Sequence, residues 1–391
     1  MNKRSISGVD VTGKTVLVRV DFNVPVRDGN ISDDSRIRAA LPTLKLLQAG
    51  GARIVVCSHF GRPKGQVVEE MRLSSVRERL SDLLGAEVQD AGGPGGDQPA
   101  SVISNLTPGK FALLENLRFD PGEEANDSTF ASHLASLADI YVNDAFGAAH
   151  RAHASTAGVA DHLPAYAGLL MERELEMLGG SLDSSKGPAV AIVGGAKVAD
   201  KIQVLKNLAK KVDTILVGGG MVAAFYAAQG NSGGAATVTD EDLAAAKELL
   251  ESRGANVVLP ADVVTAHEFK EDSPPTIFDS SSVPEDGLIL DIGPRSSTEY
   301  ARIISLVNTI IWNGPMGVFE WPEFAKGSIA VAKAVAANKK ATSVIGGGST
   351  AEIVNSLDLV DQITHVSTGG GASLEFLEGK TLPGVTALDD N

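Results

Sequence analysis

Residues 15–23 read Thr-Val-Leu-Val-Arg-Val-Asp-Phe-Asn, an apolar run that ends abruptly at polar residues and is followed by a longer stretch with a helical pattern. The same order of apolar run, distinctive loop and helical stretch recurs along the chain, for example at residues 54–62 and 189–197. This alternation is typical of parallel β-α units, and open parallel sheets bind ligands at the carboxyl ends of their strands. The sequence therefore predicts an α/β fold whose binding sites lie in these loops.

The loops at the predicted strand ends differ between the two halves of the chain. In the first half they carry arginine, as at residues 59–62 and 115–118, whereas in the second half they carry glycine, as at residues 194–195 and 346–348. Twelve of the sixteen arginines precede residue 169, and thirteen of the eighteen lysines follow it. Two sheets with two binding sites are therefore expected, the first for a small multiply charged anion and the second for a nucleotide or dinucleotide.

The two halves are separated by residues 169–178, whose composition favours a helix and whose apolar residues recur at helical spacing. Gly179 and Gly180 follow directly. We therefore predict a helix that joins two domains, with a flexible glycine segment after it.

Composition and charge narrow the classes of function. At 391 residues the chain has room for two or three domains, and its net charge of −15 argues against nucleic acid or an anionic membrane as a partner. An anionic substrate must then be bound by a local cluster of positive charge. The lone Cys57 cannot form an intramolecular disulfide, which favours a reducing compartment and hence a cytoplasmic location. The longest uncharged run, residues 214–239, is broken by glycines and does not predict a membrane helix.

Four arginines of the first half are candidates for the anion site. Arg62, Arg118 and Arg151 follow apolar runs, and Arg36 lies near the start of a predicted helix, where acidic residues are usually preferred. Arginine presents a planar fork of donors that matches phosphate and carboxylate groups. Four such residues at one edge of a sheet indicate an anion pocket, to which His59 is expected to add a positive or donor group.

Asp21 and Asn23 follow the first predicted strand and precede Pro25. Two interpretations stay open at this point. The residues can form an Asx turn before the proline, or their oxygens can accept hydrogen bonds from a hydroxylated substrate.

In the second half, Lys197 and Lys201 follow a glycine pair. Because they are four residues apart in a predicted helix, they are expected to share one face, which an anion would stabilise. Residues 312–320, which begin with a tryptophan and end with a glutamate, are expected to offer an apolar wall for a purine and a carboxylate for a ribose diol.

Two glycine-rich segments near the end of the chain predict sites for anions. Ser349 or Thr350 is expected to cap a helix over residues 351–357, which leaves the N–H groups of residues 346–348 free for a phosphate. Residues 368–373 are expected to open another helix with a similar group of N–H donors.

Other functional classes fit the sequence less well. Residues 8–15 match the phosphate-loop pattern, but a strand rather than a helix follows them, so the match is attributed to chance. A nicotinamide dehydrogenase requires a glycine fingerprint after the first strand, which residues 21–25 lack. A two-lobed α/β protein that binds nucleotides or anions without kinase activity remains the alternative.

Seven motifs, in order, resemble those of the phosphoglycerate kinase family. They are Arg-Val-Asp-Phe-Asn-Val-Pro (19–25), Ser-His-Phe-Gly-Arg-Pro (58–63), Glu-Asn-Leu-Arg-Phe (115–119), Asn-Asp-Ala-Phe-Gly-Ala-Ala-His-Arg (143–151), Gly-Gly-Ala-Lys-Val-Ala-Asp-Lys-Ile (194–202), Trp-Asn-Gly-Pro-Met-Gly-Val-Phe-Glu (312–320) and Ser-Thr-Gly-Gly-Gly-Ala-Ser (367–373). The resemblance extends over essentially the whole chain.

The resemblance implies two Rossmann-like domains, each a mainly parallel sheet flanked by helices, which face each other across a hinged cleft. Residues 1–168 would form the phosphoglycerate-binding domain, with residues 376–391 packing back on it. Residues 169–184 would form the interdomain helix and hinge, and residues 185–375 the nucleotide-binding domain. A monomer is implied, which transfers a phosphoryl group reversibly between ATP and 3-phosphoglycerate, giving ADP and 1,3-bisphosphoglycerate.

The resemblance also implies roles for individual residues. Arg36, Lys197 and Gly370 would be catalytic, with Arg36 and Lys197 facing the transferred phosphoryl group. The phosphoglycerate would be bound by Asp21, Phe22, Asn23, Arg36, His59, Phe60, Gly61, Arg62, Arg118 and Arg151. The nucleotide would be bound by Gly195, Lys201, Gly219, Leu290, Asn313, Pro315, Val318, Glu320, Gly346, Gly347, Gly348, Ser349 and Thr350.

One position departs from the family pattern. The family usually has an aspartate after its three glycines, which contacts the magnesium nucleotide, but this chain has Ser349 there. Magnesium bound with ATP or ADP is the implied cofactor, and its protein ligand is left unassigned.

Overall fold

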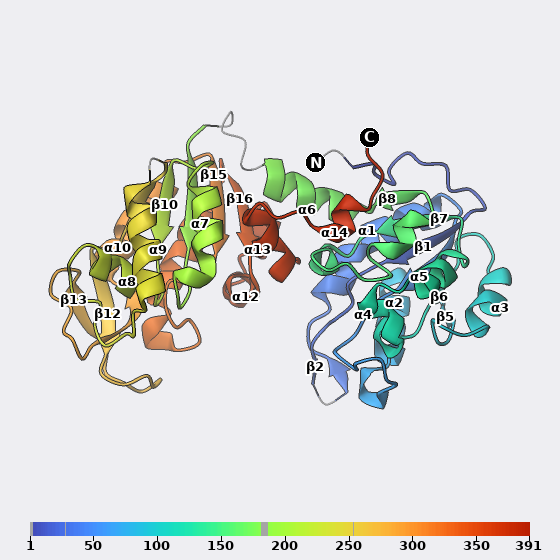
Figure 1. The fold of residues 1–391 in the computed structure, drawn as a ribbon, viewed down its shortest axis with the longest axis horizontal. Coiled ribbons are helices and arrows are strands. Elements are labelled where there is room, and N and C mark those ends of the chain that lie inside the picture. Colours follow the sequence, from blue (N-terminus) through green and yellow to red (C-terminus); the bar gives the residue numbers. More distant parts are fainter. Residues whose placement is uncertain (1–2, 28, 181–186, 253) are drawn as a thin grey trace. The chain divides into compact units, whose positions relative to one another are not determined.

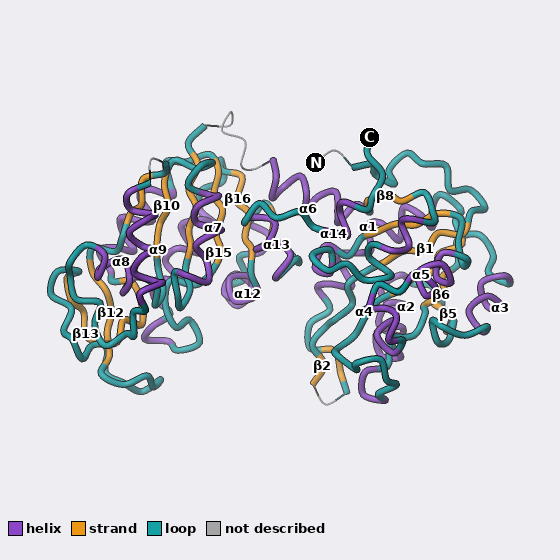
Figure 2. Tube along the Cα trace, in the orientation of Figure 1, coloured by secondary structure: helices purple, strands orange, loops and turns teal. Residues whose placement is uncertain are grey.

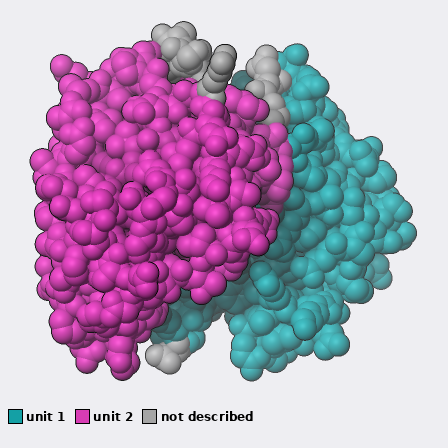
Figure 3. Space-filling view, turned by 60° about the vertical axis from the view of Figure 1, so that its left-hand side comes forward, with its two compact units in different colours: residues 1–175, 381–391 teal, residues 176–380 magenta. Residues whose placement is uncertain are grey.

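The computed structural model describes residues 3–27, 29–180, 187–252 and 254–391 (Figure 1). Contacts divide the chain into two compact units. Unit 1 comprises Met1–Leu175 and Thr381–Asn391, and unit 2 comprises Glu176–Lys380 (Figure 3). The division falls inside helix α6 (Leu169–Gly180) rather than before it. Residues 376–380 belong to unit 2, although the sequence suggested that they pack on the first domain, and residues 181–184 of the predicted hinge lie outside the described residues.

Unit 1 is built on a parallel sheet of six strands in the order β5-β6-β4-β1-β7-β8. The strands are β1 (Thr15–Arg19), β4 (Arg53–Cys57), β5 (Val88–Asp90), β6 (Phe111–Leu113), β7 (Ile140–Asn143) and β8 (Ala165–Ala167). Helices usually cover both faces of a parallel sheet, so that its strands are buried and apolar. In agreement with this, every residue of the central strand β1 is buried.

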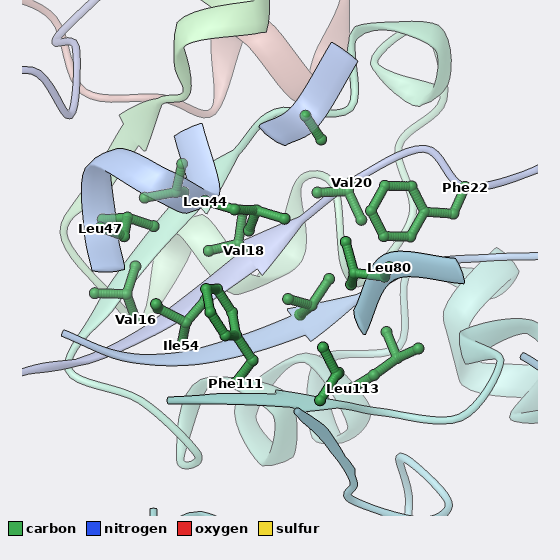
Figure 4. Packing of buried hydrophobic residues seen from close by; sticks show 14 of the residues in the cluster. Val16, Val18, Val20, Phe22, Leu44, Leu47, Ile54, Leu80, Phe111 and Leu113 are labelled. Carbon is green, nitrogen blue, oxygen red and sulfur yellow. The ribbon is translucent and has the colours of Figure 1, made fainter. Parts of the chain in front are cut away.

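One face of this sheet packs under helices α1 (Ser35–Ala49) and α2 (Ser74–Leu84). One cluster of buried residues on this face joins Val16 and Val18 of β1 and Ile54 of β4 to Leu44 of α1 and Leu80 of α2 (Figure 4). From the sequence, Ser32 is expected to cap the first helix, which would run to about Gln48. This is wrong, because α1 begins after Asp34 and no side chain caps it. The remaining elements of unit 1 are β2 (Val26–Arg27), β3 (Asn30–Ile31), α3 (Gln98–Ser104), α4 (Pro121–Ala125), α5 (Ser128–Ala135) and α14 (Pro383–Thr386).

Unit 2 contains a second parallel sheet of six strands, in the order β11-β10-β9-β15-β16-β17. The strands are β9 (Ala189–Val193), β10 (Thr214–Val217), β11 (Asn256–Val258), β15 (Thr309–Asn313), β16 (Thr342–Gly346) and β17 (His365–Val366). When the six strands of this sheet alone are numbered along the chain, their order is 3-2-1-4-5-6, the order of a doubly wound dinucleotide fold. The predicted fold of mainly parallel sheets flanked by helices is confirmed (Figure 2).

The helices of unit 2 cover its sheet. They are α7 (Ile202–Leu208), α8 (Val222–Ala228), α9 (Asp240–Glu251), α10 (Pro294–Ile304), α11 (Lys326–Ala337), α12 (Gly348–Ser356) and α13 (Gly371–Leu377). From the sequence, Asp240 is expected to cap a helix over residues 241–253. The cap of α9 is instead Thr239, whose hydroxyl accepts a hydrogen bond from the N–H of Asp242 at 3.1 Å.

A small antiparallel sheet of unit 2 was not predicted. It has the order β13-β12-β14 and consists of β12 (Asp262–Ala266), β13 (Thr276–Asp279) and β14 (Leu288–Ile292). Strand β13 is mostly exposed and has no clear apolar alternation, so sequence patterns do not reveal it.

The end of the chain is bound to unit 1 by hydrogen bonds. The side-chain amide of Asn143 donates to the carbonyl of Gly384 at 3.0 Å, and Lys3 pairs with Asp390 at 2.7 Å. Within the described part of the chain, every helix is too short or too polar to cross a bilayer.

Candidate active site

The carboxyl ends of β1, β4 and β6 place three of the predicted loops side by side in unit 1. The side-chain oxygen of Asn23, after β1, accepts a hydrogen bond from the N–H of Gly61, after β4, at 2.9 Å. The Nη1 of Arg118, after β6, donates to the carbonyl of Gly61 at 2.6 Å. Parallel neighbours end at the same edge of a sheet, so residues from separate motifs form one group.

Asp21 lies between two candidate cationic side chains. Its Oδ1 is 3.2 Å from Nη1 of Arg36 and 3.9 Å from Nε2 of His59. The same Nη1 of Arg36 donates to the carbonyl of Asn23 at 3.1 Å. The carboxylate of Asp21 therefore orients Arg36 at the start of α1, and an Asx-type contact from Oδ1 to the N–H of Asn23 at 3.2 Å is also present. Both sequence interpretations of this pair are thus compatible with the structure.

His59 is not a positive group. Burial lowers its pKa well below the ordinary value, and Arg19, Arg118, Arg36 and His153 act in the same direction. The imidazole is therefore neutral at physiological pH, and it contributes hydrogen bonds rather than charge.

The other three candidate arginines, Arg62, Arg118 and Arg151, differ in their burial and in their hydrogen-bond partners. Arg118 is only 5 % exposed, and its Nε lies 3.1 Å from Oε1 of Glu124 without hydrogen-bond geometry. Burial lowers the pKa of Arg118, and the positive charge of Arg151 acts in the same direction. Among the described residues no carboxylate pairs with Arg151, and its Nε–H donates to Nε2 of His150 at 3.2 Å. Arg62 is exposed.

Two buried polar residues that sequence analysis did not single out organise this site. Asn116 accepts hydrogen bonds from the N–H groups of Phe60 and Arg118 at 3.1 Å each, and donates to the carbonyls of Phe60 and Met71. Arg19 is fully buried and bonds to His59. Both lie inside the quoted motifs, but residue type alone does not show that they are buried.

In unit 2 the first loops meet at the switch point of the sheet, where β9 and β15 are neighbours. A Cβ on Gly194 would lie 1.8 Å from the carbonyl oxygen of Pro315. Gly219 has a φ of 73°, and a Cβ there would lie 2.6 Å from the carbonyl oxygen of Gly195. Only glycine allows these backbones to approach so closely. Gly194 and Gly219 therefore permit the close contact between the loops after β9, β10 and β15.

Lys201 points back into this junction. Its Nζ donates to Oδ1 of Asn313 at 2.7 Å and to the carbonyl of Asn313 at 3.2 Å, and burial lowers its pKa to about 8. Lys201 ends a short 3₁₀ turn (Ala199–Lys201) before α7, and Lys197 precedes that turn and is exposed. The prediction that the two lysines share a helix face is therefore wrong.

The glycines of residues 346–348 do lie at a helix N-terminus, but the cap differs from the prediction. Gly347, at a φ of 91°, is the N-cap of α12, and no side chain caps the helix. Ser349 is exposed in the first turn. Thr350 is buried, and its hydroxyl accepts a hydrogen bond from the N–H of Gly314 at 2.7 Å. Thr350 thus connects this loop to the loop after β15.

The last glycine loop follows the neighbouring strand β17. The N–H of Ser367 donates to the carbonyl of Ile345 at 2.8 Å, and the hydroxyls of Ser367 and Ser373 lie 2.6 Å apart. Gly370, at a φ of 52°, precedes α13. The loops that contain Gly346 and Gly370 therefore leave adjacent strands at the same edge of the sheet.

Trp312 does not provide the predicted wall for a purine. It is fully buried in the core of unit 2, and its indole N–H donates to the carbonyl of Gly314 at 2.8 Å. An apolar group instead surrounds two other predicted residues, Leu290 and Val318, which pack near Phe324 and Trp321. Glu320 is exposed in the same turn.

The residues present do not form a metal site of their own. Within the described residues, no group of three His, Cys, Asp or Glu side chains is placed to hold an ion. The side-chain N–H₂ of Asn313 is buried without a partner, but it is a donor and cannot bind a cation.

Comparisons with known proteins agree with this arrangement. The profile of the phosphoglycerate kinase family matches residues 6–380. A phosphoglycerate kinase of Moorella thermoacetica is 50% identical over 393 residues, with 100% of both chains covered. Solved phosphoglycerate kinases from Coxiella burnetii and Pyrococcus horikoshii superpose with TM-scores of 0.90 and 0.85, at 41% and 34% identity, and each comparison covers 98% of both chains.

Two parallel α/β units, one with an arginine-rich and one with a lysine- and glycine-rich strand-end site, define a phosphotransferase. The chain belongs to the phosphoglycerate kinase family.

Proposed function

We propose that this chain transfers a phosphoryl group reversibly between ATP and the carboxylate of 3-phosphoglycerate, which gives ADP and 1,3-bisphosphoglycerate. The observation that supports it most directly is the group formed by Asp21, Arg36, His59 and Arg118 at the strand ends of unit 1. Such a group matches a substrate that carries a phosphate, a hydroxyl and a carboxylate. The alternative of a binding protein without kinase activity is not favoured by the family to which the chain belongs.

The reaction needs no general base in the direction that consumes ATP. The nucleophile is a carboxylate, whose ordinary pKa of about 3.5–4 keeps it ionised at neutral pH. Phosphoryl transfer instead requires alignment and positive charge around the transferred group. We assign this role to Arg36 and Lys197, with the N–H groups near Gly370. Asp21 and Asn23 would hold the hydroxyl and carboxyl end of the substrate, and Arg62, Arg118 and Arg151 its non-transferred phosphate, with His59 donating a hydrogen bond.

Unit 2 would bind the nucleotide. Lys201 and the N–H groups of residues 346–350 would contact its phosphates, Glu320 its ribose, and Leu290 and Val318 its base. Gly195 and Gly219, at which the loops after β9 and β10 approach each other closely, would line this site. Magnesium, when bound with the nucleotide, neutralises phosphate charge. A monomer in the cytoplasm remains our prediction for the state and location of the chain.

A coupled assay of the purified chain tests this proposal. We expect formation of ADP from ATP only when both magnesium and 3-phosphoglycerate are present. ADP formation that does not depend on 3-phosphoglycerate, or none with any combination of the three, would exclude the proposed reaction.

The proposed sites lie on different units, so transfer requires that the two substrates be brought together. We expect closure of the units when both substrates are bound, because each ligand alone contacts only one unit. Small-angle scattering of the full chain should show a smaller radius of gyration in the ternary complex than with either ligand alone. An equal radius in all states would contradict closure.

Ser349 should be nearly neutral for stability but sensitive to a charge. Because Gly347 rather than Ser349 is the N-cap, Ser349→Ala should change the unfolding free energy by about 0.5 kcal/mol or less. Ser349→Asp should tighten magnesium–nucleotide binding by up to about tenfold, equivalent to about 1.4 kcal/mol. Titration of magnesium at fixed ADP measures this for the three proteins. Weaker binding by Ser349→Asp would show that another negative group already occupies that role.

A further inference from the structure

Arg19, Glu123 and Ser155 form a buried polar network next to His59, and the proposed reaction assigns none of these three residues a role. Arg19, at the end of β1, is fully buried in unit 1. Its Nε donates to the hydroxyl of Ser155 at 2.7 Å, and its Nη2 lies 3.2 Å from Nδ1 of His59. The same Nη2 lies 3.8 Å from Oε1 of Glu123, which is also fully buried.

Glu123 and Ser155 hold this guanidinium in place. The carboxylate of Glu123 accepts hydrogen bonds from the hydroxyl of Ser155 at 2.6 Å and from its N–H at 3.0 Å. Burial alone would raise the pKa of Glu123, but His153, Arg19 and Ser155 lower it below the ordinary value, so the carboxylate stays ionised. A buried guanidinium requires such an opposite charge, because an unpaired charge in the interior is strongly destabilising.

The contact between Arg19 and His59 restricts the proton of the imidazole. A guanidinium has five N–H donors and no acceptor. Nδ1 of His59 must therefore be the acceptor, and the ring proton must be on Nε2. Nε2 is the nitrogen that faces Asp21, at 3.9 Å from its Oδ1, on the side of the proposed substrate.

We propose that Glu123 and Ser155 are positioning residues for the phosphoglycerate site: they hold Arg19 against Nδ1 of His59, so that His59 presents its Nε2–H to the substrate as a neutral donor. The functional part of this inference rests on the proposed phosphoglycerate-binding role of unit 1. The position of the proton on His59 does not depend on that role, and it is measured separately.

The first measurement is the tautomer of His59 in the full chain. With ¹⁵N-labelled histidine, NMR distinguishes a protonated ring nitrogen from an acceptor, and the signals of His59 are those lost in His59→Gln. We expect Nε2–H with a hydrogen-bonded Nδ1 in the native chain, and loss of the Nδ1 hydrogen bond or a mixture of tautomers in Ser155→Ala. An Nδ1–H tautomer or an imidazolium in the native chain at neutral pH would overturn the inference.

The second measurement is a double-mutant cycle on the KM for 3-phosphoglycerate. The side-chain N–H₂ of glutamine can occupy the position of Nε2, and it has no tautomer to be selected. Ser155→Ala should raise KM about twofold to tenfold in the native background, the range of one hydrogen bond, and should have no further effect in the His59→Gln background. Equal effects in both backgrounds would show that Ser155 acts through general structure and not through His59.

Two further variants complete the test. Glu123→Gln leaves the charge of Arg19 buried without a counter-ion and can fail to fold, which is why Ser155→Ala is the principal variant. Ser136→Ala removes an exposed hydroxyl that bonds only to the carbonyl of His133, and it should change neither the His59 signals nor KM. If the His59 signals behave as expected but the chain lacks kinase activity, the proposed function fails while the positioning of His59 by this network stands.

Discussion

Arg36→Ala is expected to lower kcat by about 100- to 1,000-fold, the cost of removing one preorganised donor from a developing charge. Only the Nη1 of Arg36 is used in the described contacts, to Asp21 and to the carbonyl of Asn23. The rest of the guanidinium is therefore available for a phosphoryl group. If this contact forms mainly in the transition state, kcat and kcat/KM should fall together.

Arg118→Ala should act differently from Arg36→Ala. Arg118 is nearly buried and holds the loop after β4 through the carbonyl of Gly61. Its loss should mainly raise the KM for 3-phosphoglycerate, with a lower melting temperature. Arg38→Ala is the matched control for Arg36→Ala, since Arg38 lies on α1 with Arg36, is exposed, and pairs only with Asp34. Equal and purely KM effects of Arg36→Ala and Arg118→Ala would contradict this division of roles.

Gly194→Ala is expected to impair nucleotide binding more than tenfold and to destabilise unit 2. The new Cβ would lie 1.8 Å from the carbonyl oxygen of Pro315, and backbone cannot yield as a flexible side chain can. The loops after β9 and β15 would have to separate at the switch point, where the proposed nucleotide site lies. Overpacking of this kind costs roughly 1–3 kcal/mol.

Calorimetric titration with ADP and with 3-phosphoglycerate measures the result. ADP binding should weaken, while 3-phosphoglycerate binding, which we assign to unit 1, should be retained. Gly93→Ala is the control, because a Cβ there has no neighbour within 4 Å. Unchanged ADP affinity in Gly194→Ala would place the nucleotide away from this junction.

Much of the fold was predictable because strands buried on both faces leave a continuous apolar run in the sequence. The runs at β1, β9 and β15 and the loops after them were identified in this way, and both parallel sheets were found. The short antiparallel sheet was missed because its strand β13 is exposed and lacks such a run. The predicted caps at Ser32, at Asp240 and at Ser349 or Thr350 were wrong, because residue type shows which side chains are able to cap but not where the helical backbone begins.

Trp312 shows a further limit of sequence patterns. The tryptophan at the start of residues 312–320 suggested an apolar wall for a base, but it lies within strand β15, whose residues are all buried. Its indole N–H finds a backbone carbonyl inside the core, as a buried tryptophan usually does. Burial depends on which helices pack over the strand, which local composition does not determine.

By itself, the sequence determined that arginines end the strands of one sheet and glycines those of another, because residue type and order are local properties. Only the tertiary structure decided that Arg118 is buried and bonded to the carbonyl of Gly61, that Lys201 has a pKa of about 8, and that His59 is neutral. Charge and proton position depend on burial and on partners that are distant in sequence. The network of Arg19, His59, Glu123 and Ser155 exists only where the folded sheet brings four separate segments together.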